Sequence, residues 1–109
     1  MAQLELIKRL ATSTGSSKQL VAAVTGKKIR VLSMVLNRHG GTTVTVSIRT
    51  NNGSGTRILY DVGISDDTSL VLPFTDEGWF ETASGEALYL QQASTANGTI
   101  SVTLSYQEI

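Results

Sequence analysis

The chain has 109 residues, of which 40% are hydrophobic and 17% charged, a composition that predicts one globular domain and excludes wholesale disorder. No apolar run reaches the roughly 18 residues needed to cross a bilayer, and MAQLELIKRL at the N-terminus lacks the apolar block of a signal peptide. The absence of cysteine excludes disulfides and thiolate metal sites. An acidic half of the chain beside the basic half, with few interleaved aromatic residues, argues against a nucleic-acid partner.

The N-terminal segment fits two conformations. Residues 2–11, AQLELIKRLA, fit a strand with Leu4, Leu6 and Leu10 on one side. Leu6, Ile7 and Leu10 also fit a helical turn. Residues 11–17, ATSTGSS, have the composition of a flexible linker. We therefore expect residues 1–17 to form an extended N-terminal arm and linker that a neighbouring subunit orders.

Most of the remaining chain predicts β-strands. TTVTVSIRT and TISVTLSYQ alternate apolar and polar residues with a period of two, which is typical of strands with one buried face. KIRVLSMVL alternates at first and then becomes apolar on both faces, which indicates either a central strand or one covered by another chain. The predicted strands cover residues 18–24, 28–36, 42–50, 56–64, 69–73, 86–92 and 99–107.

Turn-forming residues separate these strands. Gly26, Gly40, Gly85 and Gly98 each lie between two predicted strands. Seven or eight short strands at this spacing predict an all-β fold, a single antiparallel β-sandwich of the jelly-roll kind over residues 18–109. A small closed barrel is the alternative.

The charges are segregated along the chain. All nine Lys and Arg lie in residues 1–57 with one acid, Glu5, whereas residues 58–109 contain eight acids and no base. We favour an arrangement in which strands of the two halves interleave, so that the charges cancel on the surface. The alternative is head-to-tail electrostatic packing between copies.

Few residues suggest catalysis or metal binding. The one histidine, His39, lies in NRHGG, a pattern typical of a solvated turn rather than of a catalytic base. The acid pairs Asp66-Asp67 and Asp76-Glu77 do not stand in a calcium-loop frame. We therefore predict no catalytic, cofactor-binding or metal-binding residue, and we expect the chain not to be an enzyme.

The segment DEGWFETASGEALYL holds the one tryptophan of the chain. Trp79 and Phe80 are consecutive, so in an extended chain they point to opposite sides and at least one of them enters the core. We expect Trp79 in the core and Phe80 near a subunit contact. A sugar-stacking platform of Trp79, Phe80 and Tyr89 is the less favoured alternative.

Several stretches resemble a family of small β-sandwich proteins of tailed bacteriophages. They are VAAVTGKKIRVLSMVL at 21–36, VLPFTDEGWFETASGEALYLQ at 71–91 and the final SVTLSYQEI, which occur in the family's order. The resemblance covers about residues 20–109 and implies a virion structural protein, a head decoration or cement protein that sits as a homotrimer on the capsid. A longer loop region, residues 50–69, departs from the shorter members, so the contacts of the outer surface are not carried over.

This resemblance predicts a protein of the capsid surface, assembled in the host cytoplasm, whose partners are its own copies and the major capsid protein. A tail, baseplate or head-fibre component with a glycan-binding role is the alternative. Self-association would supply buried area that a small core lacks. The predicted interface comprises the apolar residues of the arm, one face of the two-sided strand and one aromatic ring. These residues are Leu4, Leu6, Ile7, Leu10, Leu32, Met34, Leu36 and Phe80.

Overall fold

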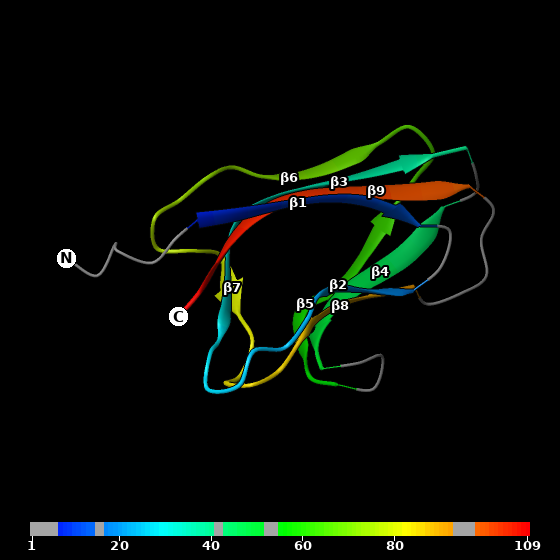
Figure 1. The fold of residues 1–109 in the computed structure, drawn as a ribbon. Helices are drawn as coiled ribbons and strands as arrows, with labels where there is room; N and C mark the ends of the chain where they lie inside the picture. The colour runs from blue at the N-terminus through cyan, green and yellow to red at the C-terminus, as the bar shows by residue number, and fades with distance from the viewer. Residues whose placement is uncertain (1–6, 15–16, 41–42, 52–54, 93–97) are drawn as a thin grey trace.

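The chain folds into two antiparallel β-sheets that pack face to face, as the computed structural model shows (Figure 1). The structure describes residues 7–14, 17–40, 43–51, 55–92 and 98–109. Within these ranges no residue is helical, and so no helix is long and apolar enough to cross a membrane. The strands are β1 (Ile7–Thr14), β2 (Lys18–Val21), β3 (Ile29–His39), β4 (Val44–Thr50), β5 (Arg57–Ile64), β6 (Ser69–Leu72), β7 (Phe80–Glu81), β8 (Leu88–Gln92) and β9 (Thr99–Glu108).

The strands are connected as a jelly roll. Sheet A has the order β1-β9-β3-β6, with the short strand β7 also pairing with β3, and sheet B has the order β2-β8-β4-β5. Apart from β7, the chain is one long hairpin in which β1 pairs with β9, β2 with β8, β3 with β6 and β4 with β5. The prediction of an all-β, jelly-roll-like antiparallel sandwich is confirmed, and the closed-barrel alternative is wrong.

The core lies between the two sheets, where alternate residues of the strands face one another. Inward-facing aliphatic side chains of both sheets form a single cluster, which explains the period-two pattern of the sequence. Arg38 follows Leu36 at the next inward position of β3 and is also fully buried. The cluster comprises Leu20, Val21, Ile29, Val31, Met34, Leu36, Val44, Val46, Ile48, Ile64, Leu88, Leu90, Ile100, Val102 and Leu104.

A β-bulge in β3 determines which of its residues enter the core. The register with β9 shifts between Val31 and Ser33, so that Leu32 is an extra residue in the strand. The shift turns Met34 and Leu36 to the same side as Val31, and both are 0% exposed. Leu32 is itself buried. The prediction that Leu32, Met34 and Leu36 form an interface surface is therefore wrong, because these residues are covered by their own chain.

The N-terminal residues that the structure describes belong to the sandwich. Residues 7–14 form β1, which pairs with β9 from Ile7 opposite Gln107 to Thr14 opposite Ile100. The inward positions of β1 include Leu10, which packs against the core. The prediction of a separate arm and linker over residues 1–17 is therefore wrong for residues 7–14, while residues 1–6 lie outside the described residues.

Ion pairs join the basic first half of the chain to the acidic second half. Lys8 Nζ lies 2.8 Å from Glu108 Oε1 across the β1–β9 pair, and Arg30 Nε lies 2.9 Å from Glu81 Oε2 across the β3–β7 pair. Lys28 Nζ lies 3.6 Å from Glu81 Oε1. The jelly-roll pairing thus brings opposite charges together, which confirms the interleaving that the charge pattern predicted.

The Lys8–Glu108 pair also affects the titration of the lysine. The hydrogen bond and the negative charge of Glu108 raise the pKa of Lys8 above its ordinary value. Because the folded-state pKa is raised, this contribution to stability is fully present below the ordinary pKa of lysine. It is lost as the pH rises through the raised pKa.

Candidate assembly surface

The two connections at one end of the sandwich bring His39, Asp66 and Asp67 together. His39 Nδ1 lies 3.0 Å from Asp67 Oδ1, and the Gly40 amide donates to Asp66 Oδ1 at 2.6 Å. One ligand atom from each of the three side chains lies within 4.8 Å of the others, and all three residues are exposed. Both carboxylates already accept hydrogen bonds that link the β3–β4 connection to the β5–β6 turn. The cluster therefore links the two turns, and His39 is exposed there, as the sequence predicted.

The predicted interface residues do not form one surface. Ile7 is exposed at the start of β1, whereas Leu10 and Phe80 are partly buried against the core. Leu4 and Leu6 lie outside the described residues.

Two exposed aromatic residues, Phe74 and Trp79, lie instead in the connection between β6 and β7, residues 73–79, which we call the β6–β7 corner. The bulge of β3 anchors it, because the Thr75 amide donates to Leu32 O at 3.0 Å and the Trp79 amide donates to Val31 O at 2.8 Å. Trp79 Nε1 donates to Pro73 O at 2.7 Å, which closes the corner on itself. Phe74 is 53% exposed and Trp79 46% exposed. A fixed turn therefore presents two aromatic rings to solvent.

The placement of the aromatic pair corrects the sequence prediction. Trp79 and Phe80 do point to opposite sides, but Phe80 packs against the core and Trp79 is exposed. The reason is that the bulge fixes the register of β7, in which Phe80 pairs with Val31. Tyr89 lies in β8 of the other sheet, so the three rings do not form the sugar platform considered above.

Truncating the two rings separates these roles. We expect Phe80→Ala to lower the free energy of unfolding by about 1–3 kcal/mol, because the ring fills part of the core. We expect Trp79→Ala to cost less, about 0.5–1.5 kcal/mol, since it mainly removes one hydrogen bond. Urea unfolding followed by circular dichroism measures both changes. A larger loss for Trp79→Ala than for Phe80→Ala would contradict the assignment.

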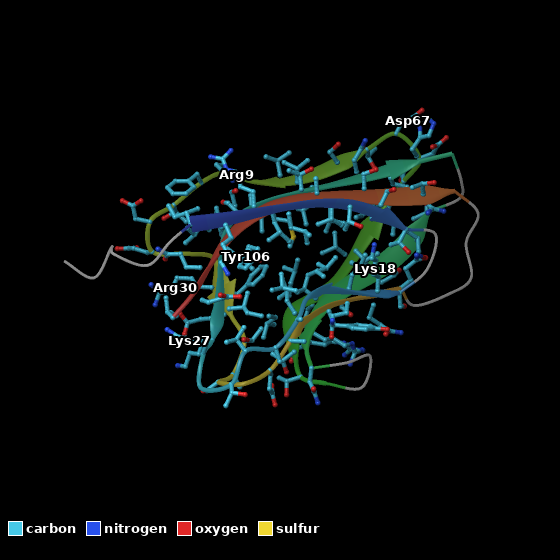
Figure 2. All side chains as sticks on the ribbon, viewed as in Figure 1. Arg9, Lys18, Lys27, Arg30, Asp67 and Tyr106 are labelled. Carbon is cyan, nitrogen blue, oxygen red and sulfur yellow. The ribbon has the colours of Figure 1, made fainter. Side chains whose placement is uncertain are left out.

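The outer face of sheet A, which we call the sheet A outer face, is a second exposed surface. Its outward positions alternate with the core residues and carry small, mostly uncharged side chains, with Val35 and Val71 directly opposite each other. Val71 is 56% exposed. Figure 2 shows Arg9 projecting from this face while Tyr106 points inward. The face comprises Ile7, Arg9, Ala11, Ser13, Ser33, Val35, Asn37, Ser69, Val71, Ser101, Thr103 and Ser105.

A shallow hollow joins this face to the β6–β7 corner. It has a volume of about 510 Å³ and is lined by Ile7, Arg9, Ser33, Phe74, Thr103, Leu104 and Ser105. A hydrogen bond between Ser33 Oγ and Ser105 Oγ, at 2.6 Å, joins two of the lining residues. Arg9 is the one charged residue among those named above. Further outward positions at the two ends of sheet A carry His39 and the ion pair of Arg30 with Glu81. A set of outward residues with one charge beside an exposed aromatic ring has the composition of the centre of a protein interface, where charged residues are depleted.

Sequence reasoning did not find this surface. The alternation in SLVLPF places Leu70 and Leu72 inward, and this pattern alone could have placed Val71 outward. The neighbours of Val71 across the sheet depend on the pairing of β6 with β3 and of β3 with β9, which no local pattern shows.

Comparisons with known proteins give a fold and no family. No family model matches the sequence, and no curated protein sequence matches it. A chain from Bacillus endospore appendages, described as disulfide-linked pili, is 14% identical and superposes with a TM-score of 0.56, covering 94% of this chain and 87% of that one. A chain from the capsid asymmetric unit of the cyanophage Pam1 is 15% identical with a TM-score of 0.47, covering 94% and 83%. The first likeness shows the fold alone, and the second is too weak to argue from.

Proposed function

We propose that the chain is a virion structural protein, a decoration or cement protein that binds the major capsid protein and stabilises the head. The observation that carries the proposal is the sheet A outer face, an exposed and nearly uncharged sheet on a rigid sandwich. Such a face loses little on desolvation, because few charges must leave water when a partner covers it. The resemblance of residues 21–36 and 71–91 to phage structural proteins supports the same role.

The role needs binding surfaces and no catalytic centre. In this proposal the protein acts as a homotrimer on the capsid surface, and the hollow beside Phe74 receives an apolar side chain of the lattice. The fold likeness to a pilus subunit is compatible with a structural role, although this chain has no cysteine with which to form the disulfide links of those pili. A place in the tail, baseplate or a head fibre is the alternative location.

The test is co-sedimentation of the purified protein with heads of the encoding phage that lack it. We expect saturable, stoichiometric binding, and we expect Val35→Arg combined with Val71→Arg to weaken it at least 10-fold, because two charges would be buried in the contact. Ala83→Arg, in the exposed connection between β7 and β8, is the matched control and should bind as the wild type.

Two results would contradict the proposal. If the wild-type protein did not bind the heads, the capsid role would be excluded. If the double variant bound as well as the wild type, the sheet A outer face would be excluded as the contact surface. Density for this chain on the tail of whole particles by cryo-electron microscopy would favour the alternative location.

A further inference from the structure

β1 is an edge strand of sheet A, and no described strand pairs with its outer side. It comes first in the strand order β1-β9-β3-β6, so β9 is its one hydrogen-bonded neighbour among the described strands. Its eight residues, IKRLATST, keep an unbroken register with β9 and include no proline or glycine. A long and regular edge of this kind is a template for the addition of another strand.

The hydrogen bonds of sheet A show which residues of β1 face this edge. Ile109 exchanges both of its backbone hydrogen bonds with Lys28, on the β3 side of β9. Because the direction of these bonds alternates along an antiparallel strand, the even-numbered residues of β9 bond to β1, where their partners are also even-numbered. The odd-numbered residues of β1 therefore direct both N–H and C=O to the free edge. They are Ile7, Arg9, Ala11 and Ser13.

The other strands at the ends of the two sheets are less suited to strand addition. β6 has four residues and is followed by Pro73, which has no N–H. β2 also has four residues, and the register of β5 with β4 shifts twice. An inward-pointing charge can protect an edge, but Lys8 of β1 is paired with Glu108 at 2.8 Å. β1 is therefore the most open of these edges.

The residues of β1 are complementary to those of a second β1. When two strands pair antiparallel about a two-fold axis at Leu10, Arg9 of one copy lies opposite Ala11 of the other. Ile7 then lies opposite Ser13, so all four edge-facing residues form hydrogen-bonded pairs, and four pairs with two bonds each give eight hydrogen bonds. An axis at Arg9 would place two arginines opposite each other, which is destabilising. An axis at Ala11 would pair Ile7 beyond the end of β1.

We propose that two copies of the chain pair through their β1 strands, antiparallel and with Leu10 opposite Leu10, so that sheet A continues from one copy into the other. Neither Lys8 nor Arg9 then lies opposite a charged residue of the second copy. The two sheet A outer faces become one surface across the axis. The contact is additional to the homotrimer of the proposed function, and on a capsid it joins a copy of one trimer to a copy of the next. It does not depend on capsid binding, because both partner strands belong to this chain.

Proline at position 11 tests the pairing in solution without capsids. The N–H of Ala11 points to the free edge, so its loss removes one hydrogen bond of each copy from the contact and none from sheet A. Light scattering should give the wild type twice the chain mass of 11.6 kDa, and Ala11→Pro should weaken association at least 10-fold. Val71→Pro is the matched control and should associate as the wild type, because the Val71 N–H points away from β3 at the opposite edge of the sheet.

A single cysteine tests the register, since the chain has none of its own. The two Leu10 residues at the axis form a non-hydrogen-bonded pair, whose Cα atoms lie about 4.5 Å apart, a distance that a disulfide spans. Leu10→Cys should therefore give a cross-linked dimer on oxidation, as seen by non-reducing electrophoresis. Ser13→Cys is the control, because the two cysteines would lie roughly 20 Å apart and should not cross-link. If Ala11→Pro failed to fold, this comparison would decide the question alone.

Three results would overturn the inference. A wild type that is a monomer at every concentration, with no cross-linking of Leu10→Cys, would exclude the pairing. A trimer that forms equally in Ala11→Pro would leave the homotrimer of the proposed function standing and exclude β1 as a contact. A monomer that binds phage heads, and loses them in Ala11→Pro, would assign the edge to a strand of the capsid protein instead. A wild-type dimer that does not bind heads would support the pairing and exclude the capsid role.

Discussion

Replacing Leu36 with alanine is expected to lower the free energy of unfolding by about 2–5 kcal/mol. Leu36 is 0% exposed in the centre of β3, the strand that pairs with β9, β6 and β7. The substitution removes three buried carbon atoms and leaves a cavity that a sandwich braced on both sides of the strand cannot close. For a domain of this size the melting temperature should fall by roughly 10–25 °C.

Val35→Ala is the matched control, because Val35 is the next residue of the same strand and lies on the sheet A outer face. It should change the free energy of unfolding by less than about 1 kcal/mol. Thermal unfolding of dilute protein, in which copies do not associate, measures both changes. If Leu36→Ala changed association and left the dilute melting temperature unaltered, Leu36 would be an interface residue and the burial argued above would be wrong.

The error over Leu36 shows what alternation can and cannot predict. The period of two located β4 and β9 within a residue or two, because their inward residues run without interruption. In β3 the same rule fails after Leu32, since one extra residue reverses the side to which every later residue points. The local pattern, apolar residues on both faces, does not distinguish a bulge from a two-sided strand, because the bulge depends on the register with β9.

Composition misled the prediction for the N-terminus in a similar way. Small polar residues such as Thr12 and Thr14 suit a linker, yet they fill inward positions of β1 opposite Val102 and Ile100. This pairing joins residues almost a whole chain apart, so it depends on the jelly-roll connection rather than on local propensity. Lys8 could have suggested the β1–β9 pairing, because its ion-pair partner, Glu108, lies in β9, the strand that a jelly-roll connection places beside β1.

The candidate surfaces were the least predictable part of the molecule. The sheet A outer face exists only once β1, β9, β3 and β6 are in register, and the sequence separates its members widely. Arg38 was unpredictable for a different reason. It is buried at the inward position after Met34 and Leu36, where the alternation predicts an apolar residue. Strand positions were therefore predictable, but the neighbours that give those positions a function were not.

Gly98→Ala is expected to destabilise the protein by about 2–5 kcal/mol, although it adds a single methyl group. Gly98 has a φ of +96°, and a Cβ there would lie 2.5 Å from His39 O and 2.6 Å from Gly40 O. Both obstacles are backbone atoms at the end of β3, so neither can rotate away as a side chain could. The methyl group must displace the start of β9 or the β3–β4 connection.

Gly26→Ala isolates the crowding from the backbone strain. Gly26 has a φ of +77°, and a Cβ there would meet nothing within 4 Å, so this variant should cost only about 1–2 kcal/mol. Urea unfolding of the two variants measures the difference. Since the positive φ is common to both, the excess for Gly98→Ala reports the close approach of Gly98 to the backbone of His39 and Gly40. Equal losses would mean that Gly98 is not held against that backbone.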